Sequence, residues 1–234
     1  MRSMKRILVA ALLIIASAGE CAWAQKSIPK PKINKSSTTT TSTSSKKAST
    51  ISRATGTIAG HDYVDLGLSV KWATCNVGAS SPSAYGNYYA WGETSTKSLY
   101  GKDNCETLGK EIGNIGGTSR DVARVKWGSP WRLPTKAEFD ELLDSENCTW
   151  TWTTQGYHNG YKVTSRKNGN SIFLPAAGWR YGTSLRIAGQ EGLYWSCTPN
   201  GSMSAYGLYF YSSDRSTFWD DRNGGRTVRP VAEF

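Results

Sequence analysis

Asp and Glu side chains are the first candidates for chemistry in this chain, because two carboxyl groups that flank a glycosidic bond can hydrolyse it. Asp140, Glu141 and Asp144 are expected on the exposed side of one short helix. Asp220 and Asp221 are adjacent in the sequence, so their side chains are expected to point apart. Neither group forms a pair facing a common substrate. We therefore predict a protein without catalytic residues, and a glycoside-acting enzyme is the third alternative.

The two histidines, His61 and His158, lie outside any Ser/His/Asp or Cys/His arrangement that would activate a nucleophile. The sequence also lacks a His-Glu-x-x-His motif, a phosphate-binding loop and a dinucleotide fingerprint. The glycine-rich string Gly113-Asn114-Ile115-Gly116-Gly117 is interpreted as a flexible turn. We therefore predict no metal site and no cofactor.

The first 24 residues have the three parts of a secretory signal peptide. A basic start is followed by an apolar run from Ile7 to Ala18, and Ala22-Trp23-Ala24 fits a cleavage site. The run is shorter than the roughly 20 residues that span a bilayer. We therefore predict an exported protein, periplasmic, on the cell surface or secreted, with no membrane span after cleavage. An uncleaved anchor is the alternative.

The next segment, residues 25–59, is predicted to be a disordered linker. Ser36 to Thr50 consists almost wholly of Ser, Thr and Lys, which cannot bury enough apolar surface to offset the entropy of ordering. This tail also carries most of the net charge of +10, since basic and acidic residues nearly cancel from His61 onward. The folded part thus lacks the basic face of a nucleic-acid-binding protein, and no nucleic-acid partner is predicted.

Export changes the interpretation of the cysteines. Cys21 would leave with the signal peptide, and an even number in an oxidising compartment indicates disulfides, with three possible pairings of the remaining four. Four buried free thiols are the alternative. No Cys-x-x-Cys or Cys/His spacing is present, so zinc is not expected. The remaining cysteines are Cys75, Cys105, Cys148 and Cys197.

The folded domain is predicted to span residues 60–234 and to be α+β, because two short helices precede many short strands. One helix is expected between Ser119 and Trp127. A second should begin at Thr135, where Thr135 and Glu138 form a capping box, and should end near Ser145. Everything after Cys148 reads as strands and turns, with hairpin signals at Asn159-Gly160 and Asn168-Gly169.

Several strings in this domain carry a family resemblance. They are Tyr63-Val64-Asp65-Leu66-Gly67-Leu68-Ser69-Val70-Lys71-Trp72-Ala73-Thr74-Cys75-Asn76, Tyr89-Ala90-Trp91-Gly92-Glu93, Trp131-Arg132-Leu133-Pro134-Thr135, Phe173-Leu174-Pro175-Ala176-Ala177-Gly178, Tyr194-Trp195-Ser196 and Val228-Arg229-Pro230-Val231. Together they resemble the Fibrobacter succinogenes major paralogous domain family of exported bacterial proteins, from about His61 to the end of the chain.

This resemblance implies a C-type-lectin-like fold with two short helices and a twisted, mostly antiparallel sheet. It also implies that the first and last strands pair, here Tyr63–Leu66 with Thr227–Val231, and it implies no known catalytic activity. The positions of two cysteines beside the family strings favour a disulfide between Cys75 and Cys148.

A second resemblance is to the variable stretch of target proteins diversified by retroelements. Ser202 to Gly225 is rich in Tyr, Ser, Asp, Asn, Gly and Arg, between two conventional ends. A polar edge strand of an ordinary paralogue is the alternative. The resemblance implies that the following residues are displayed as a ligand-binding set: Ser202, Met203, Ser204, Gly207, Tyr209, Tyr211, Asp214, Arg215, Trp219, Asp220, Asp221 and Asn223.

These features favour a recognition or adhesion module that binds an unidentified protein or glycan. Tyr and Trp provide rigid, amphipathic contact area, while Ser, Gly and Asn adapt to a ligand. Calcium-dependent sugar binding is not expected, because Thr198-Pro199-Asn200 lacks the acidic or amide ligand before proline. Four tryptophans are instead expected in the core: Trp72, Trp91, Trp131 and Trp195. A structural subunit of a surface assembly is the rival function.

Overall fold

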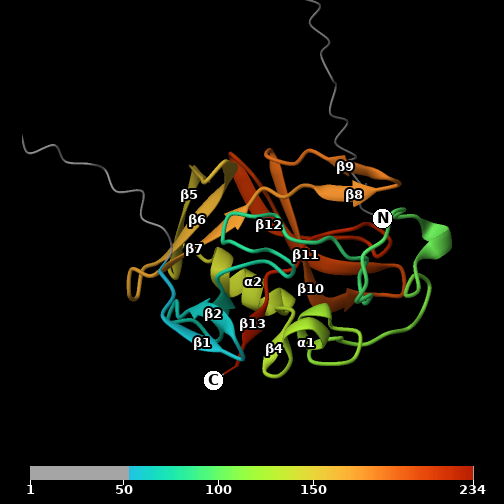
Figure 1. Ribbon diagram of the computed structural model, residues 1–234, viewed down its shortest axis with the longest axis horizontal. Helices are drawn as coiled ribbons and strands as arrows, with labels where there is room; N and C mark the ends of the chain where they lie inside the picture. Colours follow the sequence, from blue (N-terminus) through green and yellow to red (C-terminus); the bar gives the residue numbers. More distant parts are fainter. Residues whose placement is uncertain (1–52, 234) are drawn as a thin grey trace, which may run out of the picture. The chain divides into compact units, whose positions relative to one another are not determined.

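The computed structural model describes residues 53–233, so the predicted signal peptide and most of the predicted linker lie outside the described residues. The described residues are mostly β, with 41% in strands and 9% helical (Figure 1). The helical elements are η1 (Lys102–Asn104), α1 (Val122–Trp127) and α2 (Lys136–Leu143). The strands are β1 (Gly56–Ile58), β2 (His61–Val64), β3 (Lys71–Ala73), β4 (Trp131–Arg132), β5 (Cys148–Gln155), β6 (His158–Ser165), β7 (Ser171–Pro175), β8 (Trp179–Tyr181), β9 (Ser184–Arg186), β10 (Glu191–Asn200), β11 (Ser204–Tyr211), β12 (Asp214–Asp221) and β13 (Val231–Ala232).

The predicted α+β, C-type-lectin-like fold is wrong, because the described residues form several small antiparallel sheets arranged as a half-barrel with little helix. Both helices occur where the sequence predicted them, but α2 alone exceeds six residues. Asp121 shortens α1 at its start, since its carboxylate accepts from the amides of Ala123 and Arg124 and so makes Asp121 the cap. Local helix signals therefore covered too few residues to fix the class of the fold.

The five-stranded sheet has the order β1-β2-β3-β13-β4 and brings the two ends of the domain together. The predicted pairing of Tyr63–Leu66 with Thr227–Val231 is wrong, because the last strand, β13, does not pair with β2. Val231 in β13 instead lies opposite Trp72 in β3 and Arg132 in β4. Strand β2 already pairs with β1 on one side and with β3 on the other, which leaves no edge for β13. Strand β1 also lies inside the segment expected to be linker, so the folded part extends back to Gly56.

The three-stranded sheet β10-β11-β12 separates two hydrophobic clusters. Successive residues of a strand point to opposite faces. Tyr194 accordingly packs in one cluster with Leu208 and Phe210, whereas Trp195 packs in the other with Trp91. The core prediction is confirmed for all four tryptophans, which have no exposed surface: Trp72, Trp91, Trp131 and Trp195.

The predicted capping box at the start of α2 is confirmed. The Thr135 hydroxyl accepts from the Glu138 amide at 3.1 Å, and the Glu138 carboxylate accepts from the Thr135 amide at 2.7 Å. Glu138 is also held by Arg132, which joins the helix to β4. Burial alone would raise the pKa of Glu138, but the bonds from Arg132 outweigh it and the pKa is lowered.

The predicted disulfides are not formed, and the predicted pair Cys75 and Cys148 is wrong. All four cysteines of the described residues are free. Cys148 and Cys197 belong to different hydrophobic clusters, so the sheet between them prevents a bond. Burial raises the pKa of each of these two thiols to about 11. Cys75 and Cys105 are only partly buried.

Among residues 53–233, no helix is both long and apolar enough to cross a membrane.

Candidate functional site

The twelve residues predicted to form a display surface lie on or beside the β11–β12 hairpin. Their exposure differs widely. Met203, Tyr211, Asp214 and Trp219 are exposed. Ser204, Gly207 and Asn223 are buried. The remaining five are partly buried: Ser202, Tyr209, Arg215, Asp220 and Asp221.

The hairpin presents these side chains on two faces rather than one. Tyr209 and Tyr211 share a face, with ring centroids 5.8 Å apart, and Tyr209 lies 5.9 Å from Phe218. Arg215 lies on the other face, where its guanidinium is 5.6 Å from the Trp150 ring. The alternation of β12 places Trp219 on the Arg215 side. The structure therefore brings only part of the predicted set together.

Three of the twelve residues meet in a cavity of about 260 Å³ at the end of β12, which we call the C-terminal cleft. Strand β8, the 3-10 helix η1 and the segment after β12 build it. The backbones of Arg180 and Gly225 exchange two hydrogen bonds of 2.8 and 2.9 Å, which hold β8 against that segment. The cleft is lined by Lys102, Trp179, Tyr181, Asp220, Asp221, Asn223, Gly224 and Arg226.

The Arg226 guanidinium is the charged group at the base of the cleft, and its residue is 1% exposed. Three aromatic rings surround it, with centroids 4.5 Å away for Trp195, 5.4 Å for Trp179 and 5.9 Å for Phe218. Arg226 Nη2 donates a hydrogen bond to the Asp220 carboxylate. Burial lowers the pKa of Arg226, while the nearby Asp220 acts in the opposite direction.

Gly224 is approached closely by this arginine. A Cβ atom at Gly224 would lie 2.1 Å from Arg226 Nη1, closer than real Cβ atoms come to any neighbour. The segment after β12 therefore lies directly against the guanidinium. A side chain at position 224 would displace it.

Buried polar atoms without a hydrogen-bond partner concentrate at this cleft. In residues 53–233, six side-chain nitrogen or oxygen atoms are buried and unpartnered. Three of these six are Asn223 Oδ1, Arg226 Nε and Arg226 Nη1. Most buried polar groups in native proteins are paired, so a cluster of unpaired ones requires a specific explanation.

The charges of the residues that line the cleft balance, while Arg186 lies outside the lining, over the rings of Trp179 and Tyr181. Lys102 Nζ lies 3.2 Å from an Asp221 carboxylate oxygen, and Arg226 pairs with Asp220. The Lys102 and Asp221 side chains are about half exposed, whereas the arginine is fully buried. Two cations thus face two carboxylates. A ligand of the cleft does not have to bring a net charge.

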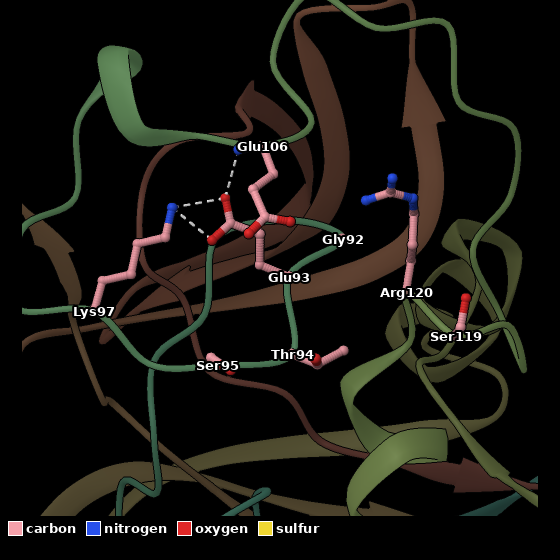
Figure 2. A pocket seen from close by; sticks show the side chains of 8 residues that line it. All are labelled: Gly92, Glu93, Thr94, Ser95, Lys97, Glu106, Ser119 and Arg120. Carbon is pink, nitrogen blue, oxygen red and sulfur yellow. Dashed lines mark hydrogen bonds and ion pairs between the residues drawn. The ribbon is translucent and has the colours of Figure 1, made fainter.

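A second cavity, of about 320 Å³, lies on the loop that follows Trp91 (Figure 2). Its buried carboxylate, Glu93, is an obvious candidate for chemistry, but its hydrogen bonds are already made. Figure 2 shows the Glu93 carboxylate bound by Lys97 Nζ and by the Glu106 amide, the amide at 2.8 Å. Glu93 is thus explained as the group that closes this loop. None of the eight lining residues was predicted from the sequence.

Sequence reasoning also missed three buried arginines in the C-terminal segment: Arg222, Arg226 and Arg229. Arg222 donates to four backbone carbonyl groups and lies 4.2 Å from the Trp91 ring centroid. Arg229 donates to Asn76 Oδ1 at 2.8 Å and to two backbone carbonyls. The available signal was three arginines within eight residues, but a sequence does not distinguish a buried arginine from a solvated one.

The two histidines lie against aromatic rings. His61 stacks on Trp127 with ring centroids 3.8 Å apart, and burial lowers its pKa. His158 lies 4.3 Å from the Tyr85 ring. Between residues 53 and 233, no group of three or more His, Cys, Asp or Glu side chains is placed to hold a metal ion.

One family profile, described as a domain of unknown function (DUF8237), matches residues 151–231. The match spans β12 and every lining residue of the C-terminal cleft except Lys102. No curated protein and no solved structure matches the chain. The resemblance to the Fibrobacter succinogenes major paralogous domain family stays a prediction from the sequence.

Proposed function

We propose that this protein is an exported recognition module that binds a ligand in the C-terminal cleft and catalyses no reaction. The observation that carries the proposal is the set of unpartnered buried atoms, Asn223 Oδ1 and two guanidinium nitrogens of Arg226. An unpaired buried polar atom costs about 1–3 kcal/mol of stability. These atoms have almost no accessible surface, so a ligand would complete their hydrogen bonds only after a small shift of the atoms that cover them, and it would then recover part of that cost.

The rest of the cleft has the composition of a ligand site. Such sites combine aromatic walls with a few placed polar groups. Here Trp179 and Tyr181 form the wall, and Tyr181 is 42% exposed. Asp220 and Asp221 stand beside them on a strand held by eight paired residues in β11. A rigid strand positions side chains better than a loop does.

A ligand screen by thermal unfolding tests this proposal, because a ligand that binds only the folded state raises the melting temperature. The full chain is screened against three panels: saccharides, short peptides and nucleotides. We expect a ligand whose effect is lost in Asn223→Leu and retained in Trp219→Ala. Trp219 is the matched control, since it is 59% exposed on the same strand but does not line the cleft.

Two results contradict the proposal. The first is a ligand that stabilises Asn223→Leu as strongly as the natural sequence, because binding would then occur elsewhere. The second is the absence of any stabilising ligand together with self-association in dilute solution. That result would favour a structural subunit of a surface assembly.

Export rests on the sequence of residues 1–24 and is a separate part of the proposal. Mass spectrometry of the protein recovered from outside the cytoplasm of a producing bacterium tests it. We expect a mature chain that begins at Gln25, after cleavage behind Ala24. A full-length chain retained in the cytoplasm would contradict export without affecting the cleft.

A further inference from the structure

We propose that the ligand of the C-terminal cleft is a neutral saccharide, bound through the hydroxyl groups of one sugar ring. This inference rests on the proposed function and specifies the class of ligand. Its observations are the kinds of unpartnered atoms in the cleft, the balance of charge and the size of the cavity.

The unpartnered atoms include both acceptors and donors of hydrogen bonds. Asn223 Oδ1 accepts, whereas Nε and Nη1 of Arg226 donate. The carboxylates of Asp220 and Asp221 add acceptors, because each has more lone pairs than its one cation uses. A hydroxyl group both donates and accepts. Adjacent hydroxyl groups on one ring therefore match a site of mixed donors and acceptors.

The charge balance argues against an ionic ligand. A cation would meet Lys102 and the buried Arg226, and an anion would meet Asp220 and Asp221. Each of these four side chains already has an opposite charge beside it. An added ionic group would break one of these pairs, and an unpaired charge in a partly buried site is costly. A neutral polar ligand leaves both pairs intact.

The size and the walls of the cleft fit one ring of a saccharide. The cleft has about 260 Å³, which is below the range of about 300–1,000 Å³ for sites that hold drug-sized ligands, so it suits a smaller ligand such as one ring. Its aromatic side is formed by Trp179 and Tyr181, whose ring centroids lie 6.0 Å apart. The Arg186 guanidinium lies over both rings, 5.4 Å from each centroid. The C–H groups of a sugar carry slight positive charge and would pack against the ring surface that Arg186 leaves open. The rest of a longer saccharide would extend into solvent.

Calorimetric titration with methyl glycosides of neutral hexoses and with neutral disaccharides tests the inference. Glucuronate and glucosamine serve as charged counterparts. We expect at least one neutral saccharide to bind the full chain and both charged counterparts to bind more weakly. Trp179→Ala and Asn223→Leu should each weaken that binding by about tenfold or more, whereas Trp219→Ala should leave it unchanged.

Asn223→Leu separates a binding role from a structural one. It removes a buried acceptor that has no partner in the protein, so the variant should melt at or above the temperature of the natural sequence. Loss of saccharide binding without loss of stability would support the inference. A variant that binds the saccharide as tightly as the natural sequence would overturn it.

Failure of the inference can be told apart from failure of the proposed function. If no neutral saccharide binds, but a peptide, a nucleotide or a charged sugar binds and is lost in Asn223→Leu, the saccharide inference is wrong and the cleft remains the ligand site. If neither Asn223→Leu nor Trp179→Ala weakens the binding of any ligand, the saccharide inference and the proposed function are both wrong. A saccharide analogue without one of the bound hydroxyl groups should bind more weakly.

Discussion

Replacement of Asp220 by Asn tests the structure of the cleft most sharply, because it removes one charge and almost no volume. Arg226 would keep its position among Trp195, Trp179 and Phe218 but would lose its carboxylate partner. Two of its nitrogens are already without a partner. The substitution therefore leaves a buried charge that solvent does not reach and that only the nearby Asp221 carboxylate still attracts.

The expected cost lies between two limits. Breaking a fully buried ion pair costs about 3–5 kcal/mol, whereas an exposed pair contributes at most about 1 kcal/mol. Here the arginine side chain is 1% exposed and that of Asp220 is 42% exposed, so solvent screens one partner only. We expect Asp220→Asn to lower the free energy of unfolding by about 2 kcal/mol. The melting temperature should fall by about 4–8 °C.

Urea unfolding followed by circular dichroism measures this cost, and a double-mutant cycle assigns it. Arg226→Met removes the buried charge, so the double variant should cost less than the sum of the two single variants by about 1–2 kcal/mol. Asp214→Asn is the control, because Asp214 is exposed at the other end of β12 and has no ion pair within residues 53–233. A cost below about 0.5 kcal/mol for Asp220→Asn, or strict additivity in the cycle, would refute the reasoning.

Three further predictions concern the scaffold. Arg222→Lys should lower the free energy of unfolding by about 3 kcal/mol, measured by urea unfolding, because lysine cannot replace the planar fork that bonds four carbonyls and stacks on Trp91; an unchanged stability would contradict it. Glu138→Gln should destabilise the protein at neutral pH, since Arg132 lowers the pKa of Glu138. Because the pKa of Glu138 is lowered in the folded state, the stabilisation by its ionised carboxylate is present above the pKa of the unfolded chain and is lost as the pH falls. The natural sequence and Glu138→Gln should therefore converge in stability below about pH 4. A constant difference in stability down to about pH 2 would count against this prediction. Thiol titration with an aromatic disulfide at about pH 8 should modify two cysteines before unfolding and two only after it, and simultaneous reaction of all four would be inconsistent with the structure; the fast pair is Cys75 and Cys105, and the slow pair is Cys148 and Cys197.

Some local features of the fold were predictable from the sequence, but the hairpin turn expected at Asn159-Gly160 was wrong, because both residues lie inside β6 and the turn is formed by Gly156 and Tyr157. The capping box at Thr135 and the burial of four tryptophans depend on short-range spacing and on apolar area, which the sequence states directly. The class of the fold was not predictable in the same way. Two helices of six and eight residues produce recognisable signals, but strand pairings between distant segments decide how the sheets are arranged.

The site was predictable only in part, for a physical reason. The prediction placed Asp220, Asp221 and Asn223 at a binding surface, and the structure brings these three together. It did not include Arg226, because an arginine in a polar segment is normally solvated. Only the stacking of Trp195 and Trp179 around the guanidinium, known once the strands are in place, reveals its burial.

The disulfide prediction failed because it depended on the compartment and not on geometry. An even number of cysteines satisfies the count for disulfides, but a bond needs Cα atoms about 4.4–6.8 Å apart. The sheet β10-β11-β12 separates Cys148 from Cys197, and Cys75 pairs with neither. Distances of this kind depend on the same long-range strand pairings that the sequence did not reveal.

The most direct test of the account is an NMR titration of the full chain with the neutral saccharide that raises its melting temperature most. The signals to follow are the side-chain N–H groups of the ten tryptophans and of Asn223. We expect the signals of Trp179 and Asn223 to shift with saccharide concentration, while the signal of Trp219 stays in place. Shifts confined to Trp219, or to the amides around Glu93 in the second cavity, would contradict it, because the ligand would then occupy a surface other than the C-terminal cleft.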